Sequence, residues 1–444
     1  MTIARDSLIR LGAARADAFG DTLPAPTLVA RLEGLRSEAL GAFEAMDVPT
    51  RRLERWKGTS LAALEAMDFA RIGPGSDADA LASETDADLL FVDGRLATPT
   101  ATRADLDEGV RVLGLAEAAS EIPELLDRHL ARLGEPKGDS LLALQTALFE
   151  DVAVVALSRG ARATRPIRIR SLVTGKAGDA ASASFPRLLV VADRESEATI
   201  LLESETRGAA PGLTVLASEL YVGAGARIEQ IEIQDGSPER IHVTNTQARL
   251  EQDGRFDSHV LSLGQGLVRS ELAVALSAPG AETRMRGFFL GHGESHVDHF
   301  TTVDHEAPHC SSDEEYRGVL ADASKGVFRG RVIVRPDAQK TDARQSNPNL
   351  LLSDRATIDT KPQLEIYADD VRASHGSTIG QLDPDALFFL RSRGIDERLA
   401  RLVLTRAFAH AIVDAISEPA LRQTIGQRVD ETLARLEERG EGSE

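Results

Sequence analysis

Hydrophobic positions recur every three or four residues in the first third of the chain. The spacing is clear in 27–46, TLVARLEGLRSEALGAFEAM, and in 121–133, EIPELLDRHLARL, and it places the apolar side chains on one face of an α-helix. Between these segments, residues 73–97 are rich in Gly, Ser and Asp and contain one short apolar run, LLFV. We therefore expect a mostly helical N-terminal domain over 1–150, with an exposed connection that holds one short strand.

The hydrophobic pattern changes at about Asp151. Short β-rich runs follow one another, among them RLLVVAD, LTVLASELYV, ARIEQIEI and GVFRGRVIV, and turn-forming pieces such as GAGAR, QDGR and APGAET precede many of them. No long helical pattern interrupts this region, 151–383, so each strand needs the next one to cover it. The pattern favours a parallel β-helix or another solenoid, and a large sandwich or double barrel remains equally compatible with it.

Helical spacing returns in the last region, 384–444. We expect two helices separated by Gly394, with Asp396 capping the second, and a charged amphipathic tail, 427–444, that runs into a disordered end. The second helix is apolar on two sides, so it must be covered twice, either by its own domain or by a partner protein. One side carries Leu402, Ala409, Val413 and Ile416, and the other carries Leu404, Phe408, Ala411 and Ala415.

Composition narrows the range of partners and locations. The 444 residues carry a formal net charge of −19 without any Lys/Arg-rich run, and only 4% of them are aromatic. Such a chain repels nucleic acid and anionic membrane surfaces and lacks rings for stacking bases. The N-terminus has neither a secretory nor a transit pattern, and no apolar stretch approaches the roughly 20 residues that span a bilayer. We expect a cytoplasmic protein of two or three structural units.

Cysteine usage and one histidine-rich stretch bear on metal chemistry. Cys310 is the only cysteine, which excludes an intrachain disulfide and a self-contained cluster held by cysteines. The stretch 291–310, GHGESHVDHFTTVDHEAPHC, suits a zinc, iron or copper site, and a stand-alone metalloenzyme on a β-helix is the alternative function that it supports. Strand alternation argues against this site, because it points His296 and Asp298 to one face and His299 to the other. The candidate ligands are His296, His299, His305, His309 and Cys310.

The segment 369–380, DDVRASHGSTIG, contains a second possible site. Ser374, His375 and Ser377 lie near Asp370, but adjacent strand residues point to opposite faces, so Ser374 and His375 cannot act as nucleophile and base. No GxSxG elbow, phosphate-binding loop or dinucleotide fingerprint occurs. We therefore expect no ATPase or dehydrogenase machinery in this chain itself.

The C-terminal half resembles a known family. The run 346–400, and within it TKPQLEIYADDV, SHGSTIG and LFFLRSRGI, is similar to the SufB/SufD family of iron–sulfur cluster assembly proteins, in particular its SufD branch. KGVFRGRVIV, AQKTDARQSNPNLLL and RRLERWKGTSL near Trp56 also resemble family segments. The resemblance extends from about Pro49 to the end of the last helices. It implies a central right-handed parallel β-helix flanked by helical N-terminal and C-terminal domains.

The resemblance also implies partners and a role. The chain would be a non-enzymatic scaffold subunit that pairs with a SufB-like homologue and binds a SufC-like ABC ATPase, with a homodimer possible when it is isolated. The isolated chain would hold no tightly bound cofactor, and a transient iron–sulfur cluster or iron would be shared with the partner. The region implied to bind the ATPase includes Leu387, Arg393, Gly394, Leu404 and Phe408.

The residue that the resemblance singles out is His375. In SufD relatives the histidine of the SHG segment is implied to lie at the interface with SufB, near a SufB cysteine, as a cluster or iron ligand. Many relatives have a cysteine where this chain has Ala373, which leaves His375 as the stronger candidate. Cys310 is expected to be structural. A SufB-type chain that accepts sulfur itself would need several thiols, so the single cysteine argues against that branch.

Overall fold

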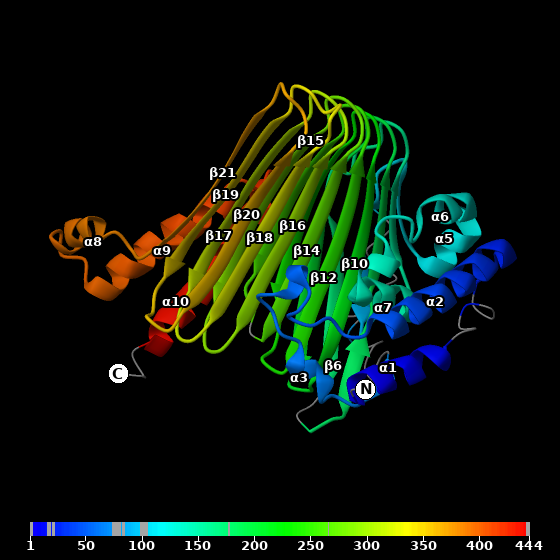
Figure 1. Cartoon of the computed structure of the whole chain (residues 1–444), viewed down its shortest axis with the longest axis horizontal. Coiled ribbons are helices and arrows are strands. Elements are labelled where there is room, and N and C mark those ends of the chain that lie inside the picture. The colour runs from blue at the N-terminus through cyan, green and yellow to red at the C-terminus, as the bar shows by residue number, and fades with distance from the viewer. Residues whose placement is uncertain are drawn as a thin grey trace.

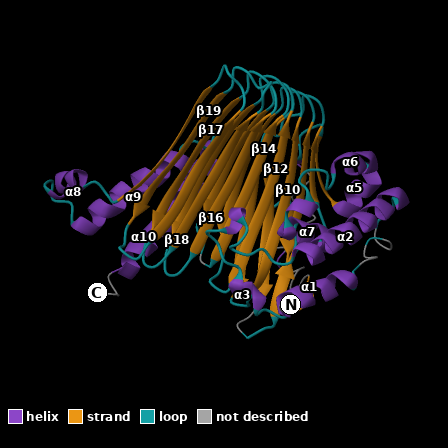
Figure 2. Cartoon of the chain, viewed as in Figure 1, coloured by secondary structure: helices purple, strands orange, loops and turns teal. Residues whose placement is uncertain are grey.

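Two sheets of mostly parallel strands face each other along the length of the molecule, and helices cover part of each outer face (Figures 1 and 2). The computed structural model describes residues 3–15, 19, 23–72, 81, 85–97, 105–175, 178–264 and 266–440. From β8 onward, successive strands alternate between the two sheets, so the chain winds as a solenoid. The predicted parallel β-helix is confirmed, and the sandwich and barrel alternatives are wrong.

The two sheets, here sheet A and sheet B, follow the order of the rungs. Sheet A runs β20 (Thr357–Ile366), β18 (Lys325–Val334), β16 (His296–His305), β14 (Leu267–Leu276), β12 (Arg240–Leu250), β10 (Gly212–Val222), β8 (Arg187–Ala192), β5 (Ala153–Leu157) and β4 (Val110–Gly114), and β7 (Ala181–Ser184) pairs with both β10 and β1 (Phe69–Ile72). Sheet B runs β21 (Arg372–Gly380), β19 (Asp342–Leu351), β17 (Ser311–Leu320), β15 (Glu282–Gly291), β13 (Arg255–Ser262), β11 (Arg227–Asp235), β9 (Glu197–Gly208), β6 (Ile167–Gly175), β2 (Leu89–Val92) and β3 (Arg95–Ala97). Among the strands that the structure describes, only the β2–β3 and β4–β5 pairs are antiparallel.

The turns from sheet A to sheet B repeat one backbone conformation. From the β8–β9 turn to the β18–β19 turn, each has a residue with positive φ, and each such residue stacks on the turn of the next rung: the Asp253 N–H donates to the Pro279 carbonyl at 3.1 Å, and the His309 N–H donates to the Gln339 carbonyl at 2.9 Å. Glycine adopts this conformation without strain, and Asp and His are enriched in it. The stacked positions are Glu195, Gly225, Asp253, Gly280, His309 and Lys340.

The main core lies between the two sheets. It consists largely of Leu, Val, Ile and Ala side chains on the inward faces of the strands, with a few larger groups such as Phe256, Met285 and Phe328. Polar inward side chains are interleaved with them and bond across the gap: the Thr360 hydroxyl on β20 donates to Asn347 on β19 at 2.8 Å. Aliphatic stacking along the rungs explains how a chain with so few aromatic residues buries a long core.

The N-terminal helices cover the outer face of sheet A at the first rungs. The predicted helix at 27–46 is confirmed as α2 (Pro26–Met46), and it packs with α7 (Ser140–Leu148) and α1 (Ile3–Ala13) over apolar residues of β5, β8, β10 and β12. The predicted run LLFV is strand β2. The rest of the predicted connection, 73–80 and 82–84, lies outside the described residues. Shorter helical segments are α3 (Ala62–Glu65), η1 (Glu54–Trp56) and η3 (Pro136–Gly138).

The helical spacing at 121–133 predicts a helix that the structure has over only part of that range. The chain forms α5 (Leu115–Glu121) and α6 (Pro123–His129), separated by Ile122. The helix cannot continue to residue 133, because Ala131 has φ 56° and the N–H groups of residues 131, 132 and 133 all donate to the Glu219 carboxylate at 2.8 Å. A buried acid on the outer face of sheet A therefore ends this helix.

The C-terminal helices cover the outer face of sheet B. Gly394, with φ 85°, separates α8 (Pro384–Arg391) from α9 (Glu397–Val413), and the Asp396 side chain caps α9 by accepting from the Leu399 N–H at 3.0 Å, both as predicted. α9 and α10 (Pro419–Gly440) pack on apolar side chains of β9, β11, β13, β15 and β17. The predicted disordered end, 441–444, lies outside the described residues.

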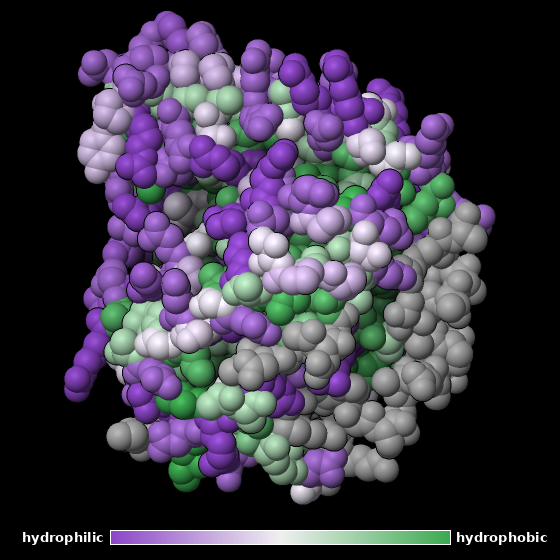
Figure 3. All heavy atoms as spheres, turned by 90° about the vertical axis from the view of Figure 1, so that its right-hand side faces the viewer, coloured by the Kyte–Doolittle hydropathy of each residue, from purple (hydrophilic) through white to green (hydrophobic). Residues whose placement is uncertain are grey.

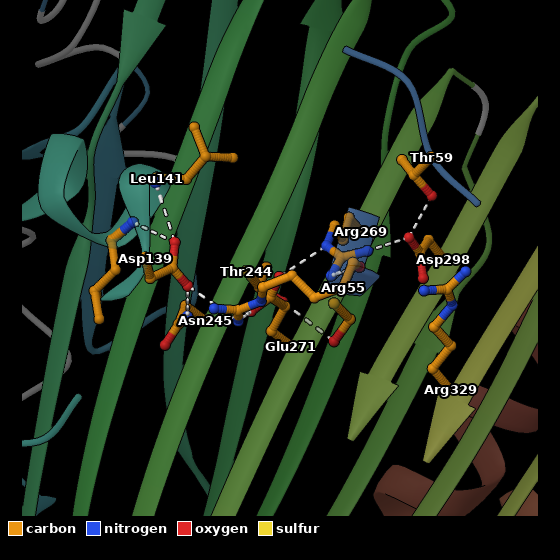
Figure 4. A network of polar contacts seen from close by, with 12 residues as sticks. Arg55, Thr59, Asp139, Leu141, Thr244, Asn245, Arg269, Glu271, Asp298 and Arg329 are labelled. Atoms are coloured by element: carbon orange, nitrogen blue, oxygen red, sulfur yellow. Dashed lines mark hydrogen bonds and ion pairs between the residues drawn. The ribbon is translucent and has the colours of Figure 1, made fainter. Parts of the chain in front are cut away.

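A segment before α3, residues 49–60, is anchored on sheet A by buried charges (Figure 4). The guanidinium of Arg269 stacks 4.0 Å from the Trp56 ring, donates to Glu271 at 2.7 Å and to Asp298, and reaches the Arg55 carbonyl at 2.9 Å. Arg55 in turn bonds Glu271. The segment RRLERWKGTSL is therefore attached to the solenoid through its backbone, its one tryptophan and its charges.

Candidate functional site

The solenoid ends on two strands that are each paired on one side only. β20 is the last strand of sheet A and β21 the last strand of sheet B, and both lie at the end of the solenoid near α9 (Figure 1). Most of β21 is exposed, and the apolar side chains of Ile366, Tyr367 and Ile379 face solvent there. The opposite end, seen in Figure 3, mixes hydrophilic and apolar side chains on the N-terminal part of the chain. The unpaired edges of β20 and β21 are a template for pairing with another chain. We call the end of the solenoid that these two strands form the open end.

His375 lies on β21 at the open end. It is in register with Gln345 of β19, and Ala373 is in register with Ala343. Because Ala343 and Gln345 are buried between the sheets and Ala373 packs against that core, His375 belongs to the inward-facing row of the last rung. With no further rung above it, its imidazole is exposed and makes no hydrogen bond or ion pair to another described residue.

The hydrolase arrangement is absent from this strand. Ser374 lies between two residues of the inward row, so its side chain is on the opposite face from His375. The imidazole is therefore free to act as a ligand for a soft or borderline metal rather than as a base for a neighbouring hydroxyl.

A polar column lies behind His375 on sheet B. The Gln345 Nε2 donates to Glu314 at 2.6 Å, and the Thr301 hydroxyl donates to the other Glu314 oxygen. Burial raises the pKa of Glu314 to about 7. Neither Glu314 nor Gln345 is among the site residues predicted from the sequence. The length of one rung could have indicated both residues, because it places residues 314, 345 and 375 in register on successive strands.

The histidine-rich stretch does not form one site. His296 faces outward from β16, where Nε2 lies 2.9 Å from the Thr59 hydroxyl, whereas His299 faces inward between the rings of Phe289 and Tyr316, each 5.2 Å away. His305 also faces inward and bonds Ser312 at 2.9 Å. Burial lowers the pKa of His299 to about 3 and that of His296 and of His305 to about 4. Strand alternation is the reason for the separation, as the pattern predicted.

The last two predicted ligands have structural positions. His309 occupies the positive-φ position of the stacked turns. Cys310 follows it as a buried residue whose thiol contacts the Ala278 carbonyl at 3.3 Å, and burial raises the pKa of the thiol. In the part of the chain that the structure describes, no three His, Cys, Asp or Glu residues are placed to hold a metal. The predicted cluster of five ligands is therefore not brought together, and the metalloenzyme alternative has no site among these residues.

The C-terminal helices present an apolar surface. Four large side chains on α8 and α9 face solvent, Phe388 with 74% of its surface exposed, and we call this set the α8–α9 patch. Arg393 lies over the Phe389 ring at 3.4 Å. The patch comprises Phe388, Phe389, Leu399 and Val403.

The residues expected to bind the ATPase fall into two groups. Leu387, Arg393 and Gly394 lie in or beside the α8–α9 patch. Leu404 is half-buried, and Phe408 packs toward the solenoid, where the Arg317 guanidinium lies 5.0 Å from its ring and donates to its carbonyl at 3.0 Å. Phe408 therefore holds α9 on β17, while Arg393 and Gly394 are exposed and Leu387 is half-buried.

Two family descriptions match most of the chain. The SufBD core domain of the SUF system for iron–sulfur cluster assembly matches residues 173–408, and the SufBD protein N-terminal region matches residues 25–169. The first match contains the open end and most of α9. Among the described helices, none has both the length and the apolar character needed to cross a membrane.

Curated relatives match over most of their own length. The iron–sulfur cluster assembly protein SufD of Escherichia coli K12 is 29% identical over 356 residues, which cover 80% of this chain and 81% of that protein. An iron–sulfur cluster assembly SufBD family protein of Synechocystis is 30% identical over 353 residues, covering 77% and 76%. A SufBD family protein of Mycobacterium leprae is 30% identical over 343 residues, covering 75% and 85%.

Proposed function

Because the chain belongs to the SufB/SufD family of iron–sulfur cluster assembly proteins, and to its SufD branch, we propose that it is a non-catalytic scaffold subunit on which a cluster is built between two chains. Family membership places it in iron–sulfur cluster assembly within the Suf system.

The observation that carries the proposal is the position of His375. It is an exposed imidazole on the free edge strand β21, and no acid or thiol in the described part of the chain is bonded to it. The chain cannot complete a ligand set there with cysteine, since its single thiol, Cys310, is buried in a turn of an earlier rung. A second chain that pairs with the open end and supplies thiolates would complete the site, with the nascent cluster as the cargo of both chains.

The proposed partner at the open end is a SufB-like homologue. Its edge strands would pair with β20 and β21, satisfying the free backbone groups and covering Ile366, Tyr367 and Ile379. When the chain is isolated, a second copy offers the same edges, so a homodimer is possible.

The proposed partner at the α8–α9 patch is a SufC-like ABC ATPase. α9 packs on β15 and β17 of sheet B, the sheet that ends in β21. Movement of the ATPase against α8 and α9 would therefore act on the same sheet that carries His375. ATP hydrolysis belongs to that partner.

The proposal is tested with the three-subunit complex. Co-expression with the SufB-like and SufC-like chains should give one complex, and its measured mass should show that all three chains are present. His375→Ala should leave that mass unchanged and abolish cluster formation, measured by the visible absorbance of reconstituted complex, because it removes the ligand without changing the edge strand.

Ser374→Ala is the matched control, since Ser374 is an exposed neighbour on the opposite face of β21. It should form cluster at the wild-type rate. A His375→Ala complex that accumulates cluster normally would refute the proposed ligand role.

A further inference from the structure

Gln345 holds a buried side-chain oxygen that has no hydrogen-bond partner among the described residues. The residue is 3% exposed, and its Nε2 donates to Glu314 at 2.6 Å. Since the nitrogen is held by Glu314 on the preceding rung, the oxygen points away from that acid. An unpaired carbonyl oxygen inside a protein is costly, so an acceptor in this position points to a missing donor.

The groups around Gln345 leave one direction for that donor. Gly330 faces Gln345 from β18, where a side-chain carbon would overlap the Gln345 amide, and Pro362, in register with Gly330 on the next rung, has no N–H. On its own strand, Ala343 has no polar side chain, and the Asn347 amide donates to the Tyr316 carbonyl at 2.8 Å. The remaining neighbour in the inward row is His375 on β21.

The distance between rungs suits a bond from His375. Neighbouring strands lie about 4.8 Å apart, and in-register side chains of parallel strands point the same way, so an imidazole N–H on β21 can reach an amide oxygen on β19. His375 is exposed at the open end and makes no bond to another described residue, so its ring is free to adopt that orientation.

We propose that Gln345 is a positioning residue for His375: its side-chain oxygen accepts a hydrogen bond from one ring nitrogen and leaves the other ring nitrogen directed at the cargo. The inference rests on the proposed function, since it concerns how His375 is presented as a ligand. Histidines that bind metals commonly donate their other N–H to a carbonyl or carboxylate, which selects the tautomer and fixes the ring. Glu314 and Thr301 would hold the Gln345 amide in the required orientation.

The test reads the His375 ring directly in the full-length chain. In protein with ¹⁵N-labelled histidine, the His375 resonances are assigned by their loss in His375→Ala, and spectra are recorded above pH 7, where Glu314 is ionised. The wild type should show a ring N–H of His375 that exchanges slowly enough with water to be observed. Gln345→Met, which has similar length and no acceptor oxygen, should lose that signal.

Matched variants keep the result interpretable. Ser346→Ala, an exposed position on the opposite face of β19, should keep the signal. Gln345→Leu is a second variant without an acceptor, and circular dichroism checks that each variant folds. An unchanged ring N–H in folded Gln345→Met or Gln345→Leu would overturn the inference.

Cluster assembly separates this inference from the proposed function. The complex containing Gln345→Met should bind iron roughly 10- to 100-fold more weakly at the shared site, the size of effect that outer-shell partners have on metal affinity. Normal cluster formation by His375→Ala would refute the proposed function, whereas the ring N–H signal decides the role of Gln345 independently of it.

Discussion

At the scale of the residue, Arg269 shows how strongly this fold relies on single buried charges. Its side chain is fully buried, stacks on Trp56 and pairs with Glu271 and Asp298. Burying a charge is costly unless several partners neutralise it, and removing one member leaves the others unpaired.

Arg269→Met should destabilise the chain by about 3–5 kcal/mol, the cost of leaving buried carboxylates without their partner. Urea unfolding followed by circular dichroism measures this change. Arg335→Met is the control, because Arg335 pairs with Asp304 at the surface with 51% of its side chain exposed, and it should cost less than about 1 kcal/mol. Equal effects of the two substitutions would contradict the structural role given to Arg269.

The sequence predicted only part of what the histidines do in the fold. The sequence predicted opposite faces for His296 and His299, and the structure has them so. It could not predict that His309 occupies a left-handed turn position, because that position is defined only when successive turns stack. Gln345 was missed for the same reason, since its neighbours Glu314 and His375 are each one rung away in the chain.

At the scale of the element, α9 answers the question raised by a helix that is apolar on two sides. Ala409, Val413 and Ile416 of the first side are buried against sheet B. On the second side Phe408 also packs on the solenoid, while Ala415 is exposed. The rest of this chain therefore covers the first side of α9 and part of the second. The accessible apolar surface lies nearer α8, in the α8–α9 patch.

Phe388→Asp should weaken binding of the SufC-like ATPase at least about tenfold, because a large aromatic side chain at the centre of an interface commonly contributes more than about 1.4 kcal/mol. Calorimetric titration of the purified subunits measures this change. Since Phe388 is 74% exposed, the thermal stability of the free chain should stay the same.

Gln423→Asp on the exposed side of α10 introduces the same charge away from the patch. It should bind the ATPase as the wild type does. Loss of binding in both variants, or in neither, would contradict the assignment of the patch.

At the scale of the whole molecule, the polar groups between the sheets make stability depend on pH in two opposite ways. Burial lowers the pKa of His242 to about 4 and that of His299 to about 3, so they contribute stability that is present above their ordinary pKa of 6.5 and lost as the pH falls. Burial raises the pKa of Glu314 from 4.5 to about 7, so this carboxyl lowers stability as the pH rises through that window.

Glu314→Gln should remove the loss of unfolding free energy that Glu314 causes between pH 4.5 and 7. The difference from wild type should grow with pH to about 3 kcal/mol in favour of the variant, since one pKa unit corresponds to about 1.4 kcal/mol. Urea unfolding over a pH series measures it. Glu315→Gln, on the opposite face of β17, is the control and should show no such growth. A constant difference across the series would contradict the buried, protonated state of Glu314.

Local patterns in the chain were enough to predict the helices around residues 27–46 and 384–416, the strand-rich middle and the opposite faces of neighbouring histidines, because these depend on residues within a few positions of each other. The resemblance to the SufB/SufD family added the β-helix itself. Folding in three dimensions alone placed His375 above Gln345 and Glu314, ended α6 at His129 and buried Arg269 under Trp56. These features depend on register between strands about 30 residues apart and on long-range charge pairs, and short-range periodicity carries no information about either.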